Sequence, residues 1–546
     1  MLNFGSNNFN HFTQVNSTKN EPLSLFITHE DDENLNYNFS LKSFEICSKF
    51  TKSSDNNVSD NEEEVQSTSE MCEYFVNCDG QIRDVDILHT LVYSQFENVL
   101  LILVATNSTS HYFTNEDDFY TFLQLYTLKF DSENSLNLEN SLQLLSLFPV
   151  KMDYCVQLKW LQVNYETGFL FAVLLFNSGK VKIARFNINK LSNLLQSTQD
   201  LSKRVLDLEF VWEYNQNINY NNKINCFDIS YKICESLVML ACGTNDGFLL
   251  ILDFNLNLFN SNTHTSDTKD EVDCIEVDSE VVDSFKTVPV LTGVNNTPVY
   301  RSILSLNFLP LPNSFILAIG TFSKGVVLWD VRHVDGELKT YSNIMKPVNK
   351  VNWSRNSQFL LCCTSSGLYI DWQNNTTANS INPVKLSKDK INNVWDNICW
   401  NVDSSDDTIT YSFDSGQLIQ LMMSNMNKKN IYNDFTIYQW DFLKPQMEME
   451  VYKYSDSMVD NVNYSMKNRF IKDLNFAKKV GISITKSNSS VNTSNVEPND
   501  NLLKMRTKIL SLNTVKSMMT SISSYKINLM VYGGNLGLLH LILTVE

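Results

Sequence analysis

The sequence predicts an all-β protein built from one hairpin unit that repeats along the chain. Two observations support this prediction. Six segments share the order of an apolar run, a short polar turn with glycine and a second apolar run, and amphipathic stretches long enough for helices between strands are few. The unit is clearest in "LAIGTFSKGVVLWDVRH" at residues 317–333. The six segments are 169–187, 236–255, 314–332, 358–374, 407–423 and 527–546.

A glycine follows the polar turn residues in every copy. Asn, Asp or Ser opens a tight turn by bonding its side chain to nearby backbone N–H groups. Glycine then adopts the left-handed conformation that returns the chain to the ladder. The predicted blade-turn glycines are Gly179, Gly247, Gly325, Gly367, Gly416 and Gly537.

The spacing of these glycines favours a β-propeller. Gly325 and Gly367 are 42 residues apart, and Gly416 follows 49 residues later. A four-stranded propeller blade takes about 40–45 residues. The wider gaps require insertions, which we place near 255–286 and 425–505, where the chain is polar. With a seventh unit at 97–130, the sequence predicts seven blades over residues 81–546.

Residues 1–80 are predicted to be an acidic, Asn-rich and mostly disordered tail. Its tract 53–70, "SSDNNVSDNEEEVQSTSE", is polar and acidic. The apolar run at 22–28 is a candidate for the strand that closes the ring, because closure removes exposed sheet edges.

The alternation within residues 326–331 indicates strands covered on both sides. Val326, Leu328 and Asp330 share one face, whereas Val327, Trp329 and Val331 share the other, so both faces are largely apolar. A parallel α/β sheet would give the same runs but needs long helices between its strands. The best helix candidates, 190–210 and 464–480, lie outside the hairpins.

Composition limits the function classes. The chain has 546 residues and a net charge of -18, which argues against tight nucleic-acid binding by this chain alone and leaves open a local basic face. The eleven cysteines are odd in number and several lie in apolar runs, as expected for buried free thiols in a reducing compartment. No secretory signal or membrane span is predicted. We therefore expect an intracellular protein.

Enzymatic motifs are missing from the sequence. "GTFSKG" at 320–325 has the glycine spacing of a phosphate loop, but valines follow where Lys and Ser or Thr are required. No nucleophile elbow, zinc-binding helix motif or calcium loop is present. The seven histidines are scattered singly. We expect no catalytic residue, metal ligand or cofactor, although residues distant in sequence can assemble an active site.

The Trp-Asp dipeptide at Trp329 and Asp330 stands where a WD40 repeat ends its third strand. Further Trp-Asp pairs occur at 395–396 and 440–441, but the Gly-His dipeptide of WD40 repeats is absent. The sequence therefore predicts a degenerate WD40-like β-propeller.

Residues 153–183, "DYCVQLKWLQVNYETGFLFAVLLFNSGKVKI", resemble the start of the propeller in the WD40 subunit of transcription factor TFIIIC. In that family a blade opens with Cys and Trp, here Cys155 and Trp160, followed by a glycine, here Gly168. An apolar run at 169–175 then leads to the turn at Gly179. Segments 226–254, 301–333 and 348–370 continue in similar fashion, so the resemblance covers roughly residues 150–425.

This resemblance implies a nuclear, non-catalytic scaffold that helps recruit the RNA polymerase III machinery to tRNA-type promoters. Its partners would be protein subunits of a multi-subunit complex, including a second propeller. Family members can carry a basic, DNA-contacting N-terminal extension, and here that region is acidic, so DNA contact is expected to be indirect at most. No membrane or small-molecule substrate is implied. The alternatives are a cytoplasmic WD40 adaptor for trafficking, ubiquitin ligation or ribosome assembly, and a propeller enzyme.

Overall fold

The structure is a computed structural model of the whole chain. It describes residues 23–29, 32–41, 44–52, 70–78, 80–89, 98–108, 121–130, 141–150, 154–161, 168–195, 204–214, 223–231, 237–255, 282–289, 302–372 with short gaps, 382–383, 399–404, 408–413, 417–422, 437–441, 512–522, 525–534 and 537–545.

Six antiparallel sheets of four strands follow one another along the described chain, and we call them blades 1 to 6. In each blade the four strands are hydrogen-bonded in chain order. Blade 1 comprises β5 (Gly80–His89), β6 (Val99–Ser108), β7 (Thr121–Lys129) and β8 (Leu142–Val150). Blade 2 comprises β9 (Cys155–Leu161), β10 (Phe169–Phe176), β11 (Val181–Asn187) and β12 (Glu209–Tyr214). Blade 3 comprises β13 (Ile224–Tyr231), β14 (Leu237–Thr244), β15 (Phe248–Asn255) and β16 (Val282–Pro289).

The next three blades have shorter strands. Blade 4 comprises β17 (Ile303–Phe308), β18 (Ile316–Thr321), β19 (Val326–Asp330) and β20 (Glu337–Tyr341). Blade 5 comprises β21 (Val348–Trp353), β22 (Phe359–Thr364), β23 (Gly367–Trp372) and β24 (Asn382–Pro383). Blade 6 comprises β25 (Cys399–Ser404), β26 (Thr408–Phe413), β27 (Gln417–Met422) and β28 (Ile437–Asp441).

A further sheet, the closing blade, combines the two ends of the described chain. Its strand order is β29 (Leu512–Ile522), β30 (Tyr525–Gly534), β31 (Leu538–Val545), β4 (Glu70–Asn77) and β3 (Ile46–Lys52). The remaining strands, β1 (Leu23–His29) and β2 (Asp32–Leu41), form a two-stranded sheet.

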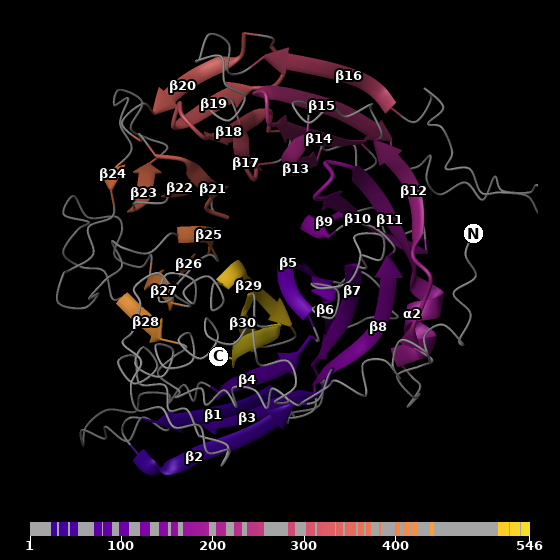
Figure 1. Cartoon of the computed structure of the whole chain (residues 1–546), viewed down its shortest axis with the longest axis vertical. Helices are drawn as coiled ribbons and strands as arrows, with labels where there is room; N and C mark the ends of the chain where they lie inside the picture. Colours follow the sequence, from indigo (N-terminus) through magenta and orange to yellow (C-terminus); the bar gives the residue numbers. More distant parts are fainter. Residues whose placement is uncertain are drawn as a thin grey trace, which may run out of the picture.

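The six blades and the closing blade stand around one axis (Figure 1). The first strand of each sheet is nearest the axis, and it contacts the first strand of the next sheet in the cyclic order β5, β9, β13, β17, β21, β25, β29 and back to β5. The ring is therefore closed, and the fold is an all-β, WD40-like β-propeller. Each of the seven hairpins predicted from the sequence supplies the second and third strands of one sheet.

The core lies between neighbouring blades. As predicted, the two faces of β19 are both covered: Val327 and Trp329 pack in a cluster with blade 3, whereas Val326 packs in a cluster with blade 5. β19 therefore contributes apolar side chains to two separate clusters, which explains why its sequence reads as a continuous apolar run.

The strand predicted to close the ring, 22–28, does not do so. It corresponds to β1, which pairs only with β2 among the described strands. The ring is closed by β4, which pairs with β31 along its whole length. The reason is the alternation within β4: Cys72, Tyr74 and Val76 are fully buried on one face. The boundary placed near residue 80 is therefore too late, since β3 and β4 belong to the propeller.

The described part of the chain contains one helix, α2 (Ile188–Leu195), which overlaps the start of the predicted range 190–210. It buries Ile188 and Leu191. The chain then returns at 204–206 to the outer strand of blade 1, where Leu206 N donates to Leu147 O at 2.9 Å. This segment covers the otherwise exposed edge of β8. The candidate helix 464–480, most of the acidic tract 53–70 and most of the predicted insertions lie outside the described residues.

Candidate interaction site

Four of the predicted turn glycines lie between the second and third strands of their sheets with positive φ. The φ values are 90° at Gly179, 86° at Gly247, 77° at Gly325 and 76° at Gly537. Gly367 is the first residue of β23 and pairs with Thr364, while Gly416 lies outside the described residues.

Two of these turns also leave no room for a side chain. A Cβ on Gly537 would lie 2.7 Å from the carbonyl oxygen of Gly80, where blade 1 begins. A Cβ on Gly325 would overlap the carbonyl oxygen of Tyr341 at the end of β20. At both positions glycine is required by backbone conformation and by close packing.

Trp329 and Asp330 lie at the end of β19, and both are buried. The Asp330 carboxylate accepts hydrogen bonds from Arg332 Nε at 2.9 Å and from Arg332 Nη2 at 2.6 Å. These bonds hold the pKa of Asp330 below its ordinary value. The Arg332 guanidinium stacks over the ring of Phe315, 5.0 Å from its centroid. The dipeptide therefore shapes the connection that follows it.

We call this end of blade 4 the rim, and it comprises residues 310–311, 314–315, 331–333 and 335–338. Its two connections are joined where Val331 N donates to Phe315 O at 3.0 Å. Leu311 is 47% exposed and Leu338 is 54% exposed. Among the described residues, the only other exposed large apolar side chain is Phe248, at the opposite end of blade 3. The rim is thus where apolar surface and an oriented arginine occur together.

The seven inner strands share a feature that our alignment of glycine turns missed. Each contains one β-bulge near its start, followed by a polar–apolar–polar triplet. We call these the seam triplets. Cys226 is the only non-polar residue at the first or third position of a triplet. They are 84–86 (DVD), 157–159 (QLK), 226–228 (CFD), 305–307 (SLN), 350–352 (KVN), 401–403 (NVD) and 514–516 (TVK).

The side chains at the first and third positions of the seam triplets form hydrogen bonds with the next sheet around the ring. Asp84 Oδ2 accepts from the backbone N–H of Leu158 at 2.8 Å, and Asp86 Oδ2 accepts from that of Trp160 at 2.8 Å. Asn307 Oδ1 accepts from Trp353 N at 2.7 Å. An inner strand exposes one row of backbone groups toward its neighbour. These side chains satisfy that row and join the sheets.

Asp228 makes the densest of these connections. It accepts from Lys159 Nζ at 2.6 Å on one side and from Phe308 N at 2.6 Å on the other. Asn307 Nδ2 also donates to it at 3.3 Å. One carboxylate thereby ties blades 2, 3 and 4 together.

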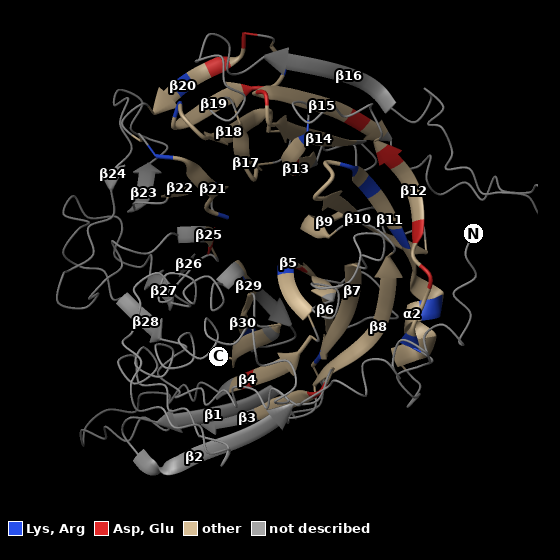
Figure 2. Cartoon of the chain, in the orientation of Figure 1, with Lys and Arg blue, Asp and Glu red and all other residues tan. Residues whose placement is uncertain are grey.

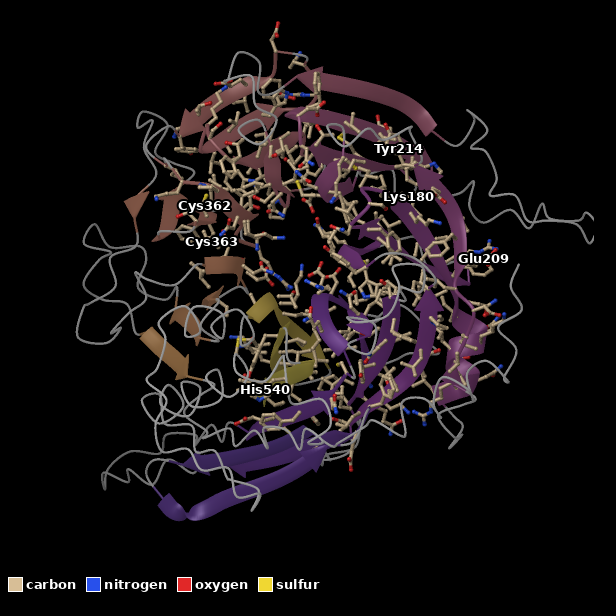
Figure 3. All side chains as sticks on the ribbon, viewed as in Figure 1. Lys180, Glu209, Tyr214, Cys362, Cys363 and His540 are labelled. Carbon is tan, nitrogen blue, oxygen red and sulfur yellow. The ribbon has the colours of Figure 1, made fainter. Side chains whose placement is uncertain are left out.

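The closing joint, where β29 of the closing blade meets β5 of blade 1, is held by the same kind of side-chain contacts. Thr514 Oγ1 donates to Asp84 at 3.0 Å, and Lys516 Nζ lies 3.5 Å from Asp86. Burial raises the pKa of Asp84 above its ordinary value despite nearby lysines. Burial would lower the pKa of Lys516, but the surrounding carboxylates, Asp86 foremost, raise it instead. Figure 3 shows side-chain nitrogen and oxygen atoms gathered around the axis.

On the outer surface of blade 2, acidic and basic side chains alternate. Figure 2 shows basic residues on β11 beside acidic residues on β12. Arg185 Nε donates to Glu209 at 3.0 Å, and Lys182 pairs with Glu213 at 2.8 Å. Opposite charges at this spacing neutralise each other, so this face presents no patch of one sign.

No three His, Cys, Asp or Glu side chains of the described residues converge as metal ligands. Eight described cysteines are free thiols, and all but Cys47 are buried. None of the described helical residues forms a span of bilayer length.

No family model and no curated protein matches the chain. Among solved structures, the chain is similar to the crystal structure of Raptor from Chaetomium thermophilum, with 10% identity and a TM-score of 0.41. That match covers 86% of this chain and 28% of the other, so the chain spans less than a third of that structure. By its own strand order and ring closure, the chain is a WD40-like β-propeller.

Proposed function

We propose that this chain is a non-catalytic scaffold in a nuclear transcription assembly, with a role like that of the WD40 subunit of TFIIIC. It would act through protein–protein contacts with other subunits, including a second propeller. The observation that carries the proposal is the use of the seam triplets. The charged groups best suited to chemistry, such as Asp228, instead bind backbone groups of the next blade.

A ring held in this way is a rigid support for its connections. Connecting segments carry binding function in most such folds. Here 26 residues separate β15 from β16, and 70 separate β28 from β29. The nuclear and transcriptional part of the proposal is supported by the sequence resemblance over roughly 150–425, and the net charge of -18 favours protein partners over DNA.

The direct test is purification of the tagged protein from its own cells followed by mass spectrometry. We expect TFIIIC-type subunits to co-purify, nuclear staining, and a loss of tRNA-gene transcription when the protein is depleted. Exclusively cytoplasmic staining with trafficking, ubiquitin-ligase or ribosome-assembly partners would instead identify the adaptor alternative. Turnover of a substrate by the purified chain would contradict a non-catalytic role.

The rim provides a matched pair of variants for the same experiment. Replacing Leu311 and Leu338 by Asp changes exposed side chains without touching the core, so the ring should stay folded. We expect this double variant to lose at least one partner. Phe248→Asp, which alters an exposed apolar residue at the opposite end of blade 3, is the control. Equal partner sets for both variants would remove the rim from the proposal.

A further inference from the structure

The seam between β4 and β31 contains a buried histidine. His540 on β31 is 3% exposed, and it is labelled in the closing blade in Figure 3. Its ring stacks on Phe75 of β4, with centroids 4.2 Å apart and planes at 19°. On the other side, Tyr532 of β30 meets it edge-on at 4.8 Å. The imidazole is therefore enclosed by aromatic rings from both neighbouring strands.

One carboxylate faces this histidine from the strand that closes the ring. Glu73 Oε2 on β4 lies 3.1 Å from His540 Nε2. The other titratable groups in this row are Tyr532 on β30 and Cys47, which pairs with Phe75 from β3. From the side of blade 6, Thr410 contacts Met530 of the same sheet. Glu73, which pairs with Ile542 and with Lys49 of β3 on either side of β4, is the acidic group that acts on His540.

We propose that the β4–β31 seam is an acid-sensitive latch, which loosens when His540 becomes protonated and thereby frees the strand that closes the ring. The neutral imidazole fits the aromatic enclosure and donates one bond to Glu73. The imidazolium is a buried cation whose hydration is lost, and one partly exposed carboxylate compensates for only part of that loss.

The direction of the effect follows from linkage. Burial lowers the pKa of His540 below its ordinary value of 6.5, and the attraction of Glu73 offsets only part of this. The opened seam then binds a proton more readily than the closed seam. The pairing of β4 with β31 keeps its full stability at pH values above the pKa of His540 in the opened state. This stability is lost as the pH falls from that pKa toward the lower pKa of the closed state.

Hydrogen exchange of the full chain, measured by mass spectrometry, tests the latch. We compare residues 70–77 and 538–545 with β18 and β19 of blade 4, after correction for intrinsic exchange. With an ordinary pKa in the open state, the opening constant of the seam should rise up to about tenfold between about pH 7.5 and 5.5. Blade 4 should change far less.

Variants separate the latch from general acid sensitivity. His540→Gln should abolish the acid-dependent opening of the seam, whereas His333→Gln, at an exposed histidine of the rim, should leave it unchanged. If His540→Gln does not fold, titration of the His540 ring in wild-type protein by carbon-labelled histidine NMR replaces it. A midpoint above 6.5, equal opening in blade 4, or acid-dependent opening that persists in His540→Gln would overturn the proposal.

Discussion

Blade 4 and the closing blade hold their fourth strands in different ways. In blade 4, β20 follows β19 after a six-residue connection, 331–336, and β20 exposes Leu338 at its edge. In the closing blade, β4 comes from the other end of the chain, and the Glu73–His540 contact spans 467 residues. Yet β4 is the more buried of the two strands and is covered in turn by β3.

The contacts of β4 explain this difference. Tyr74 bonds Ser141 of blade 1 at 2.6 Å. Immediately after β4, the carbonyl of Cys78 accepts from the buried Gln124 at 2.6 Å. A strand joined by a short connection is held near its partner by the chain itself, whereas a distant strand must be held by its own contacts. The closing strand β4 therefore depends on its own side-chain and backbone contacts, whereas β20 depends on the short connection that precedes it.

Removing β4 should have the largest effect. A chain lacking residues 1–78 leaves the apolar faces of β31 and blade 1 uncovered, at a cost on the order of 5 kcal/mol or more for its buried side chains. We expect loss of a cooperative thermal transition by calorimetry. A chain lacking residues 1–42, which retains β3 and β4, is the control and should still melt cooperatively. If both truncated chains melted with the same cooperativity, the contacts of β4 would not be what holds the closing blade together.

Single side chains on the two strands should differ next most. Tyr74 is fully buried, so Tyr74→Ala should cost about 3–5 kcal/mol through cavity formation and the lost bond to Ser141. Leu338→Ala on β20 should change the unfolding free energy by less than about 0.5 kcal/mol. Urea denaturation measures both, and a costly Leu338→Ala would show that β20 is also anchored by its side chains.

The seam triplets allow the two joints to be compared directly. Asp228→Ala leaves Lys159 and two N–H groups without their acceptor, so we expect a loss of about 3 kcal/mol at the joint with blade 4. Thr514→Val removes one hydroxyl bond at the closing joint and should cost about 1 kcal/mol. Asp228→Asn should retain part of the stability. If Thr514→Val lowered the unfolding free energy more than Asp228→Ala in urea denaturation, the closing joint would contribute more to stability than the joint with blade 4.

The turns should behave alike in both blades. Gly325→Ala and Gly537→Ala each combine positive φ with a backbone oxygen in the way, so each should cost about 2–3 kcal/mol. Gly168→Ala has φ 70° but nothing within 4 Å of the added Cβ, so about 1 kcal/mol is expected. The difference between these losses in thermal unfolding isolates the steric part. Equal losses at all three would attribute the cost to conformation alone.

The hairpins could be predicted from sequence because their signals are local. A glycine with positive φ and flanking apolar runs occupy fewer than twenty residues, as at Gly325. The closing strand could not, because its partner β31 lies more than 450 residues away and no local signal records that pairing. The polar and acidic tract 53–70 ends where β4 begins, so the alternation of Cys72, Tyr74 and Val76 is assigned to a disordered tail.

The seam triplets could have been predicted from the sequence. Their polar–apolar–polar pattern repeats seven times, but it is short, and its bulge sets it out of step with simple alternation. The Trp329–Asp330 pair was identified, whereas its role in orienting Arg332 over Phe315 required the structure, because those side chains come from different connections.

The pairing of β4 with β31 also dictates when the molecule can be completed during synthesis. The ribosome makes β4 more than 450 residues before β31, so β4 lacks this partner while the blades between them are being made. Blade 1 meanwhile lacks the neighbour that covers Leu100 and Ile102. That apolar surface of blade 1 is therefore uncovered in the nascent chain until β31 has been made.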